Sequence, residues 1–187
     1  CISIDGSTGN IYLGEIPKVK LDTNENFKTL LKWLDEFRKI GVRANADTPN
    51  DAMHANQFNT DGIGLCRTEH MFFNKIRIPI VRSMILANYE DERKEYLDEL
   101  LKFQREDFVE IFKLMDNKPV NVRLLDPPLH EFLPKTDVEI ENLAASMGLT
   151  MNDMHYRIEN LKESNPMLGH RGCRLAITFP EIYKMQA

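Results

Sequence analysis

The segment NVRLLDPPLHEFLP, residues 121–134, contains the end of a predicted strand and the loop that follows it. Val120, Val122 and Leu124 alternate with Asn121 and Arg123, which is the two-residue period of a strand. An aspartate and two prolines then end the strand, because proline has no N–H group to donate to a sheet. We therefore expect the guanidinium group of Arg123 close to the carboxyl end of a strand.

The charged side chain of Arg123 has two interpretations. In parallel α/β folds, ligands bind at the carboxyl ends of the strands, so the planar fork of guanidinium donors can hold an anionic ligand there. Alternatively, Arg123 forms a structural ion pair with Asp126, three residues further along the chain. The spacing alone favours the ion pair, and both interpretations stay open at this point.

A second short apolar run, GIGLCR at residues 62–67, also ends on an arginine. Its two glycines indicate close approach of backbone or ligand, although a GxG pattern alone is weak evidence for a phosphate loop. Cys66, next to Arg67, is either an activated thiol or an ordinary buried cysteine. His70 has no second histidine at ligand spacing, so we predict a hydrogen-bonded scaffold residue rather than a metal ligand.

A third basic cluster lies in NPMLGHRGCRL, residues 165–175, where His170, Arg171 and Arg174 stand among glycines. Backbone donors and a guanidinium group in such a loop can hold an anion. The same cluster can equally form ion pairs between two domains. The sequence does not separate these two interpretations.

Composition narrows the class of protein. The chain has 187 residues and a formal net charge of −5, so we expect no nucleic acid as a partner. We also expect no membrane partner, because no apolar run reaches the roughly 18 residues of a membrane-spanning helix. The three cysteines lack CxxC spacing, which predicts reduced thiols and a cytoplasmic location, with any organelle address outside this sequence. Because the chain begins with Cys1, we expect a fragment of a longer protein.

The hydrophobic periods predict alternating strands and helices. A β-hairpin is expected at residues 1–16, a linker at 17–24, and strands at 42–46, 62–67 and 120–125. Helices are expected from residue 25 to Gly41, from Pro49 to about residue 61, at 79–87, at 90–115, and from Pro180. Two more are expected behind Thr136, in a capping box with Glu139, and behind Thr150. Thr48 or Asp47 is expected to cap the helix that begins at Pro49.

This order predicts an α/β fold with a parallel sheet. Strands that end on arginines suit a (β/α)8 TIM barrel, in which the carboxyl ends of the strands form the ligand-binding face. Only three such strands are present, whereas eight close a barrel. We therefore predict an incomplete TIM barrel, consisting of the first three strands and their helices, preceded by a short β-hairpin.

Three segments together resemble the pyruvate phosphate dikinase family in its phosphoenolpyruvate/pyruvate-binding barrel. They are GLCRTEHMFF at residues 64–73, RLLDPPLHEFLP at 123–134 and NPMLGHRGCRL at 165–175. VRANADTP at 42–49 is similar to the first barrel strand of that family, and ISIDGSTG at 2–9 to the end of its swivelling phosphohistidine domain. The resemblance spans essentially the whole chain. It implies a phosphohistidine-domain tail at residues 1–16, a linker at 17–24, and the N-terminal part of the barrel at 25–187.

The resemblance implies the reversible conversion of ATP, inorganic phosphate and pyruvate into AMP, diphosphate and phosphoenolpyruvate, with Mg²⁺ as cofactor. Arg67 and Arg123 would bind the phosphate of phosphoenolpyruvate, and Arg171 would assist. Asp126 and His130 would orient the arginines or the loop. ATP and AMP would bind through an absent domain, and the parent enzyme would be a homodimer.

The same resemblance places the catalytic groups outside this sequence. The phosphorylated histidine would precede Cys1, while the Mg²⁺-binding carboxylates and the cysteine that protonates the enolate would follow Ala187. We therefore expect no catalytic residue and no metal ligand here, and no dikinase activity from the 187 residues alone. Alternatives are a fragment of phosphoenolpyruvate synthase or of the sugar-phosphotransferase enzyme I, although LDPPLHEFLP fits the dikinase better. A non-catalytic interaction module that assembles through exposed barrel edges is a further alternative.

Overall fold

The computed structural model describes residues 1–17 and 24–187. It divides into two compact units, Cys1–Gly41 and Val42–Ala187, which are described separately below. Residues 18–23 of the predicted linker lie outside the described residues, and the predicted domain boundaries stay a prediction. In the described part, no helix is long and apolar enough to cross a membrane.

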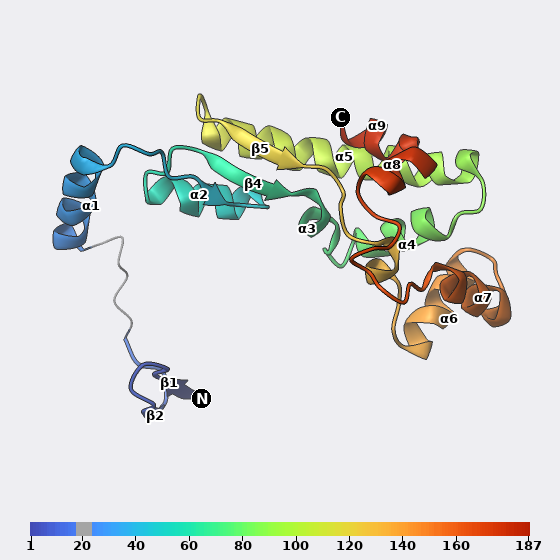
Figure 1. Ribbon diagram of the computed structural model, residues 1–187. Helices are drawn as coiled ribbons and strands as arrows, with labels where there is room; N and C mark the ends of the chain where they lie inside the picture. The colour runs from blue at the N-terminus through green and yellow to red at the C-terminus, as the bar shows by residue number, and fades with distance from the viewer. Residues whose placement is uncertain (18–23) are drawn as a thin grey trace. The chain divides into compact units, whose positions relative to one another are not determined.

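The first unit contains the predicted hairpin and the predicted first helix (Figure 1). Strand β1 (Ile2–Ile4) pairs antiparallel with β2 (Ile11–Leu13). Helix α1 (Glu25–Phe37) begins behind Asn24, whose side chain accepts hydrogen bonds from the backbone N–H groups of residues 26 and 27. The expected end near Gly41 is wrong, because the backbone is already extended at Arg38.

The second unit is built on a parallel sheet of three strands in the order β3-β4-β5. These are β3 (Ala44–Asn45), β4 (Ile63–Arg67) and β5 (Val120–Arg123). The predicted strands at 42–46 and 120–125 were both too long. β5 ends at Arg123, and the N–H and C=O groups of Leu125 pair with side chains of the last helix instead of a strand.

Gly62 allows β4 and β5 to start side by side. Its φ of 150° is a conformation that L side chains rarely adopt, and an added Cβ would lie 2.4 Å from the carbonyl oxygen of Pro119. The N–H group of the next residue, Ile63, donates a hydrogen bond of 2.9 Å to the same carbonyl oxygen of Pro119. The close backbone approach predicted from the two glycines is therefore confirmed.

Among the described residues, nine helical elements complete the second unit, one of them a short 3₁₀ helix. They are α2 (Pro49–Gln57), α3 (Thr68–Phe72), α4 (Ile78–Leu86), α5 (Glu90–Met115), η2 (Leu129–Phe132), α6 (Asp137–Ser146), α7 (Met151–Leu161), α8 (Cys173–Thr178) and α9 (Pro180–Gln186). α2 ends earlier than predicted, because Asn59 takes a left-handed φ of 52°. The predicted caps of α6 and α7 at Thr136 and Thr150 are confirmed, and of the two residues predicted for α2, Thr48 is the cap. In α6, however, the Glu139 carboxylate accepts from the N–H group of Lys135, one residue before the cap.

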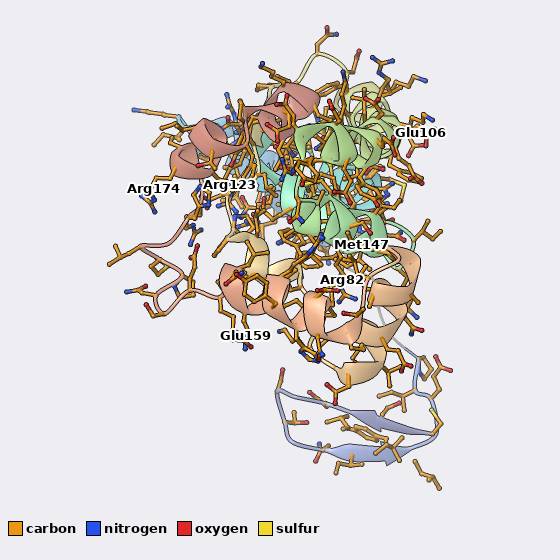
Figure 2. All side chains as sticks on the ribbon, turned by 90° about the vertical axis from the view of Figure 1, so that its right-hand side faces the viewer. Arg82, Glu106, Arg123, Met147, Glu159 and Arg174 are labelled. Carbon is orange, nitrogen blue, oxygen red and sulfur yellow. The ribbon has the colours of Figure 1, made fainter. Side chains whose placement is uncertain are left out.

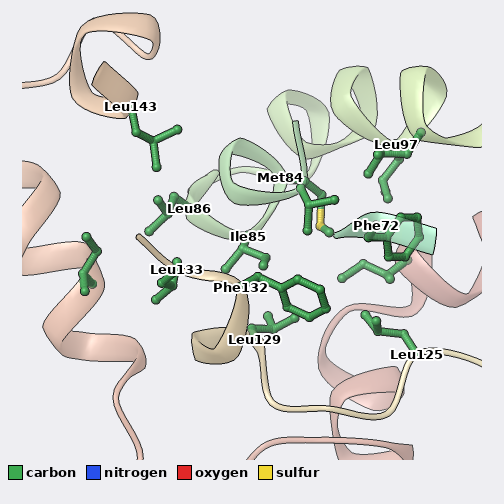
Figure 3. Close-up of a cluster of buried hydrophobic side chains, with 14 of the residues drawn as sticks. Phe72, Met84, Ile85, Leu86, Leu97, Leu125, Leu129, Phe132, Leu133 and Leu143 are labelled. Atoms are coloured by element: carbon green, nitrogen blue, oxygen red, sulfur yellow. The ribbon is translucent and has the colours of Figure 1, made fainter. Parts of the chain in front are cut away.

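Two hydrophobic clusters hold the second unit together. The smaller lies between the sheet and helices α2 and α5, and comprises Ala46, Ala52, Ile63, Cys66, Met71, Ile111 and Met115. The larger joins α3, α4, α5, α6 and the loop behind β5 (Figure 3). In that loop, Phe132 also stacks on Phe73. The DPPLHEFLP loop is therefore anchored by its own apolar residues, which fixes the chain just beyond Arg123.

The fold is thus a mixed α/β arrangement with a small parallel sheet and a separate antiparallel pair of strands. α3, η2 and α8 were not predicted. They have four to six residues each, which is too short for a helical period to be recognised. All three lie beside the basic motifs, so the least predictable elements surround the candidate site.

Candidate anion-binding site

Arg67 and Arg123 are register partners at the ends of neighbouring parallel strands. Parallel strands have their carboxyl ends on the same side of the sheet, so both arginines lie at these strand ends, which we call the carboxyl edge of the sheet. Figure 2 labels Arg123 there. Residues in register on adjacent strands also direct their side chains to the same face. The sequence predicted each arginine near a carboxyl end, and the structure adds that the two stand opposite each other.

Arg67 is fixed by Asp47, which follows β3. One carboxylate oxygen of Asp47 accepts the backbone N–H of Arg67 over 2.6 Å, and the other lies 3.5 Å from its Nη1. The same second oxygen lies 2.8 Å from Nδ1 of His70. His70 is therefore hydrogen-bonded to the scaffold, as predicted. Asp47 ties the end of β4 to the end of β3.

Arg123 lies between two carboxylates. Its Nη2 donates to Oε1 of Glu69, in the first turn of α3, and its Nη1 lies 3.6 Å from Oδ2 of Asp126. The ion pair with Asp126 predicted from the spacing is present, and Glu69 is a second, more deeply buried partner. Among the described residues, Nε of Arg123 and Oε2 of Glu69 are buried without a hydrogen-bond partner.

Arg171 joins the same edge from the GHRG loop. Its Nη2 donates to Oδ2 of Asp126 over 2.8 Å, and this hydrogen bond raises the pKa of Arg171. The next residue, Gly172, has a φ of 54°, and an added Cβ would lie 3.2 Å from Oδ1 of Asp126. Arg171 therefore pairs within the Val42–Ala187 unit rather than between two domains.

These side chains form two groups of ion pairs at the same end of the sheet, which we together call the arginine–carboxylate network. Arg67 pairs with Asp47, while Arg123 and Arg171 pair with Glu69 and Asp126. Three cations face three carboxylates, so the edge is locally balanced in a chain whose net charge is −5. Each guanidinium group has five N–H donors, more than the carboxylates here use. The remaining donors match the oxygens of a phosphate group, which arginine binds in the same geometry as a carboxylate.

Helix α9 fixes the backbone next to the arginines of this network, through hydrogen bonds to Leu125, Thr68 and Gly172. Oε1 of Gln186 accepts the N–H of Leu125 over 2.8 Å, while its Nε2 donates to Oγ1 of Thr68 over 3.0 Å. The hydroxyl of Tyr183 lies 2.7 Å from the carbonyl oxygen of Leu125 and 3.0 Å from that of Gly172. Burial, reinforced by the nearby Asp126 carboxylate, raises the pKa of Tyr183 to about 12, so the hydroxyl keeps its proton.

Two other residues singled out in the sequence lie outside this network. His130 is in η2 and lines a cavity of about 440 Å³ with His155 and residues of α6 and α7. Its Nδ1 is buried without a hydrogen-bond partner among the described residues. Cys66 is fully buried, and this burial, with the Asp47 and Glu69 carboxylates nearby, raises the pKa of its thiol to about 12. Cys66 is thus an ordinary buried cysteine rather than an activated thiol.

The described residues do not fit a magnesium site. Within residues 1–17 and 24–187, no group of three or more His, Cys, Asp or Glu side chains gathers closely enough to hold a metal ion. The three carboxylates of the network each face an arginine instead. No chemical step is therefore assigned to a metal ion bound by these residues.

Sequence reasoning missed four residues that build the site: Asp47, Glu69, Tyr183 and Gln186 as partners of the basic motifs. Asp47 was considered only as a helix cap. A signal for Glu69 was available, since a carboxylate two residues behind Arg67 follows the strand end directly. No local pattern indicates Tyr183 or Gln186, because their partners lie far away in the sequence.

Comparison with known proteins gives a consistent result. A family model described as PEP-utilising enzyme, PEP-binding domain, matches residues 22–187, where PEP is phosphoenolpyruvate. The chain is 54% identical over 185 residues to a pyruvate, phosphate dikinase of Rickettsia prowazekii (strain Madrid E). It is 53% identical over 186 residues to that of Rhizobium meliloti (strain 1021), and 50% over 185 residues to that of Clostridium symbiosum. These alignments cover 99% or 100% of this chain but 21% of each relative, so the chain spans about a fifth of their length.

Proposed function

This chain belongs to the PEP-utilising enzymes, within their PEP-binding domain, and from that premise we propose that Arg67, Arg123 and Arg171 bind the phosphoryl group of PEP. The observation that carries the proposal is the register pairing of Arg67 with Arg123 at the carboxyl edge of the parallel sheet. Two guanidinium groups on the same face of that edge can reach oxygens of one phosphoryl group. Arg171, tied to Asp126, completes the cationic side of the site.

We propose further that the chain is part of a pyruvate, phosphate dikinase. That enzyme would convert ATP, phosphate and pyruvate into AMP, diphosphate and PEP, as the resemblance implies. Residues 25–187 would supply the first three strands of a (β/α)8 barrel, and residues 1–16 the tail of the phosphohistidine domain. The parallel order β3-β4-β5, with helices between the strands, supports this arrangement. Binding of Mg²⁺ and ATP, dimerisation, and a cytoplasmic location are likewise proposed for the whole enzyme.

In the proposed reaction, the residues of this chain bind and orient the transferring group. Guanidinium forks set against a sheet edge stabilise the charge that spreads over the phosphoryl oxygens, and phosphoryl transfer depends chiefly on such positioning. Asp47, Glu69 and Asp126 keep the three arginines in place before the substrate arrives. Pyruvate lacks the phosphoryl group, so its binding should depend less on these arginines.

That difference between PEP and pyruvate provides the test. In the full-length enzyme, Arg123→Met should raise the dissociation constant of PEP roughly 10- to 100-fold, because a charge-assisted hydrogen bond contributes about 1.5–3 kcal/mol. The dissociation constant of pyruvate should change less than about threefold. Both constants can be measured by isothermal titration calorimetry.

The matched control is Arg77→Met. Arg77 also faces a carboxylate, that of Asp107. Within residues 1–17 and 24–187, its side-chain hydrogen bonds go to Asp107 and to the carbonyl oxygen of Met71, neither of which belongs to the arginine–carboxylate network. Replacement of Arg77 should leave both dissociation constants within about twofold of the unaltered enzyme. Equal weakening of PEP and pyruvate by Arg123→Met, or no weakening of either, would contradict the proposed role.

A further inference from the structure

Glu69 is an unusual carboxylate within the described part of the chain. Only 4% of the residue is exposed, and the partner of its Oε1 is the guanidinium group of Arg123. Its other oxygen, Oε2, is buried and makes no hydrogen bond to any described residue. Burying a charged group is costly unless it is fully paired, and a buried ion pair contributes little to stability on balance. Stability alone therefore gives a poor reason for a glutamate at this position.

Arg123 shows the complementary feature. Its Nη2 is engaged by Glu69, while its Nε is buried without a partner among the described residues. The Nη1 nitrogen faces the more exposed carboxylate, Asp126, at 3.6 Å. Nη2 is thus turned toward the buried Glu69, and Nη1 toward the more exposed Asp126, at a distance too long for a hydrogen bond. This orientation leaves Nη1 to meet an incoming ligand.

Glu69 and Asp126 are not equivalent partners. The Asp126 side chain is 31% exposed and also pairs with Arg171, so it is solvated and shared. Glu69 is held on the first turn of α3, which follows β4 without an intervening loop. The preceding residue, Thr68, is fully buried and bonded to Gln186. The Glu69 backbone is therefore fixed relative to both arginine-bearing strands.

We propose that Glu69 is a positioning residue that sets the orientation of Arg123 for the phosphoryl group of PEP. This inference rests on the proposed function, because it concerns the same phosphoryl-binding arginine. Glu69 stays on Nη2 when PEP binds, and the phosphoryl group is bound through Nη1. The carboxylate acts through Arg123 and does not itself touch the substrate. A preset guanidinium group loses less conformational freedom on binding, which favours affinity for the phosphorylated substrate.

The inference predicts a selective effect in the full-length enzyme. Glu69→Gln keeps the length and one acceptor but removes the charge, and should raise the dissociation constant of PEP about 3- to 10-fold. Glu69→Met removes every acceptor and should raise it more than 10-fold. Neither substitution should change the dissociation constant of pyruvate more than about twofold. Glu181→Gln, which alters the pair between Glu181 and Arg93, is the matched control and should leave both constants unchanged.

A double-mutant cycle separates positioning from a general structural role. Because Glu69 acts through Arg123, Glu69→Met should cause no further loss of PEP affinity when Arg123→Met is already present. The double variant also removes both charges of the buried pair, so it remains measurable even where Glu69→Met alone does not fold.

Each result has a distinct meaning. If Arg123→Met weakens PEP binding but Glu69→Gln does not, the positioning role is wrong and the proposed function stands. A loss from Glu69→Met that persists in full without Arg123 also overturns the positioning role alone. If Arg123→Met leaves PEP binding unchanged, both the proposed function and the inference fail.

Discussion

Gln186 connects the two arginine-bearing strand ends, and its removal gives a prediction whose size follows from the structure. In Gln186→Leu, the N–H of Leu125 and the hydroxyl of Thr68 both lose their side-chain partner. Both residues are at least 98% buried, so water cannot replace the lost bonds without local opening. For Leu125, the lost hydrogen bond contributes about 1 kcal/mol, and the unsatisfied buried donor adds about 1–3 kcal/mol. We expect Leu125 to be destabilised locally by about 2–4 kcal/mol.

The assay is native-state hydrogen exchange of the Leu125 amide, followed by NMR in the 187-residue chain. A loss of 2–4 kcal/mol corresponds to a roughly 30- to 900-fold fall in the protection factor of that amide. Gln186→Glu is the matched control, because it keeps an acceptor for Leu125 and loses only the donor to Thr68. Thr68→Val removes the other end of the bridge and should leave Leu125 protected.

The reasoning is refuted if the Leu125 amide keeps its protection in Gln186→Leu. That result would mean that another group satisfies this N–H and that α9 does not fix the chain beyond β5. It is refuted equally if Gln186→Glu and Gln186→Leu lower the protection to the same extent, since only the second removes the acceptor.

Three further predictions concern stability, measured by urea unfolding followed by circular dichroism. Gln104 is 98% buried, and neither amide atom has a hydrogen-bond partner among the described residues. Gln104→Met should therefore raise the free energy of unfolding by about 1–3 kcal/mol. A decrease would show that the amide is satisfied. Gly62→Ala should lower the free energy of unfolding by about 1–3 kcal/mol or more, because the new Cβ would meet the Pro119 carbonyl oxygen. An unchanged free energy of unfolding would refute the close approach of Gly62 to Pro119. Burial raises the pKa values of Cys66 and Tyr183 to about 12 from ordinary values of 9.0 and 10.0. These two groups therefore ionise at a lower pH in the unfolded chain than in the folded one. The free energy of unfolding should fall as the pH rises from 9 toward 12. Cys66→Ala should flatten the fall above pH 9 and Tyr183→Phe the fall above pH 10, and unaltered slopes would contradict the raised pKa values.

The two strand-end arginines were within reach of sequence reasoning because each follows a short apolar run and precedes a change of pattern. A period of two residues and a pair of prolines suffice to place Arg123 near a carboxyl end. The register between Arg67 and Arg123 is a different matter. It depends on how Gly62 and Pro119 align the starts of β4 and β5, which is a tertiary contact between residues far apart in the sequence.

Apart from Asp126, the partners of the arginines could not be predicted, for the same reason. Spacing offered Asp126 as the ion-pair partner of Arg123, and the structure adds Glu69, which lies 54 positions earlier. Arg171 reaches Asp126 across 45 positions. Such pairings follow from the packing of α3 and the GHRG loop around the sheet, and α3 is too short to show a helical period. Local patterns identify the three cations and Asp126 here, whereas only the packed fold identifies Asp47 and Glu69 as their partners.

The most direct test of the central claim is a crystal structure of the full-length enzyme with PEP bound. We predict that guanidinium nitrogens of Arg67 and Arg123 both lie about 2.7–2.9 Å from oxygens of one phosphoryl group, the range of charge-assisted hydrogen bonds. A phosphoryl group bound elsewhere, or one that contacts only one of these two arginines, would contradict the account.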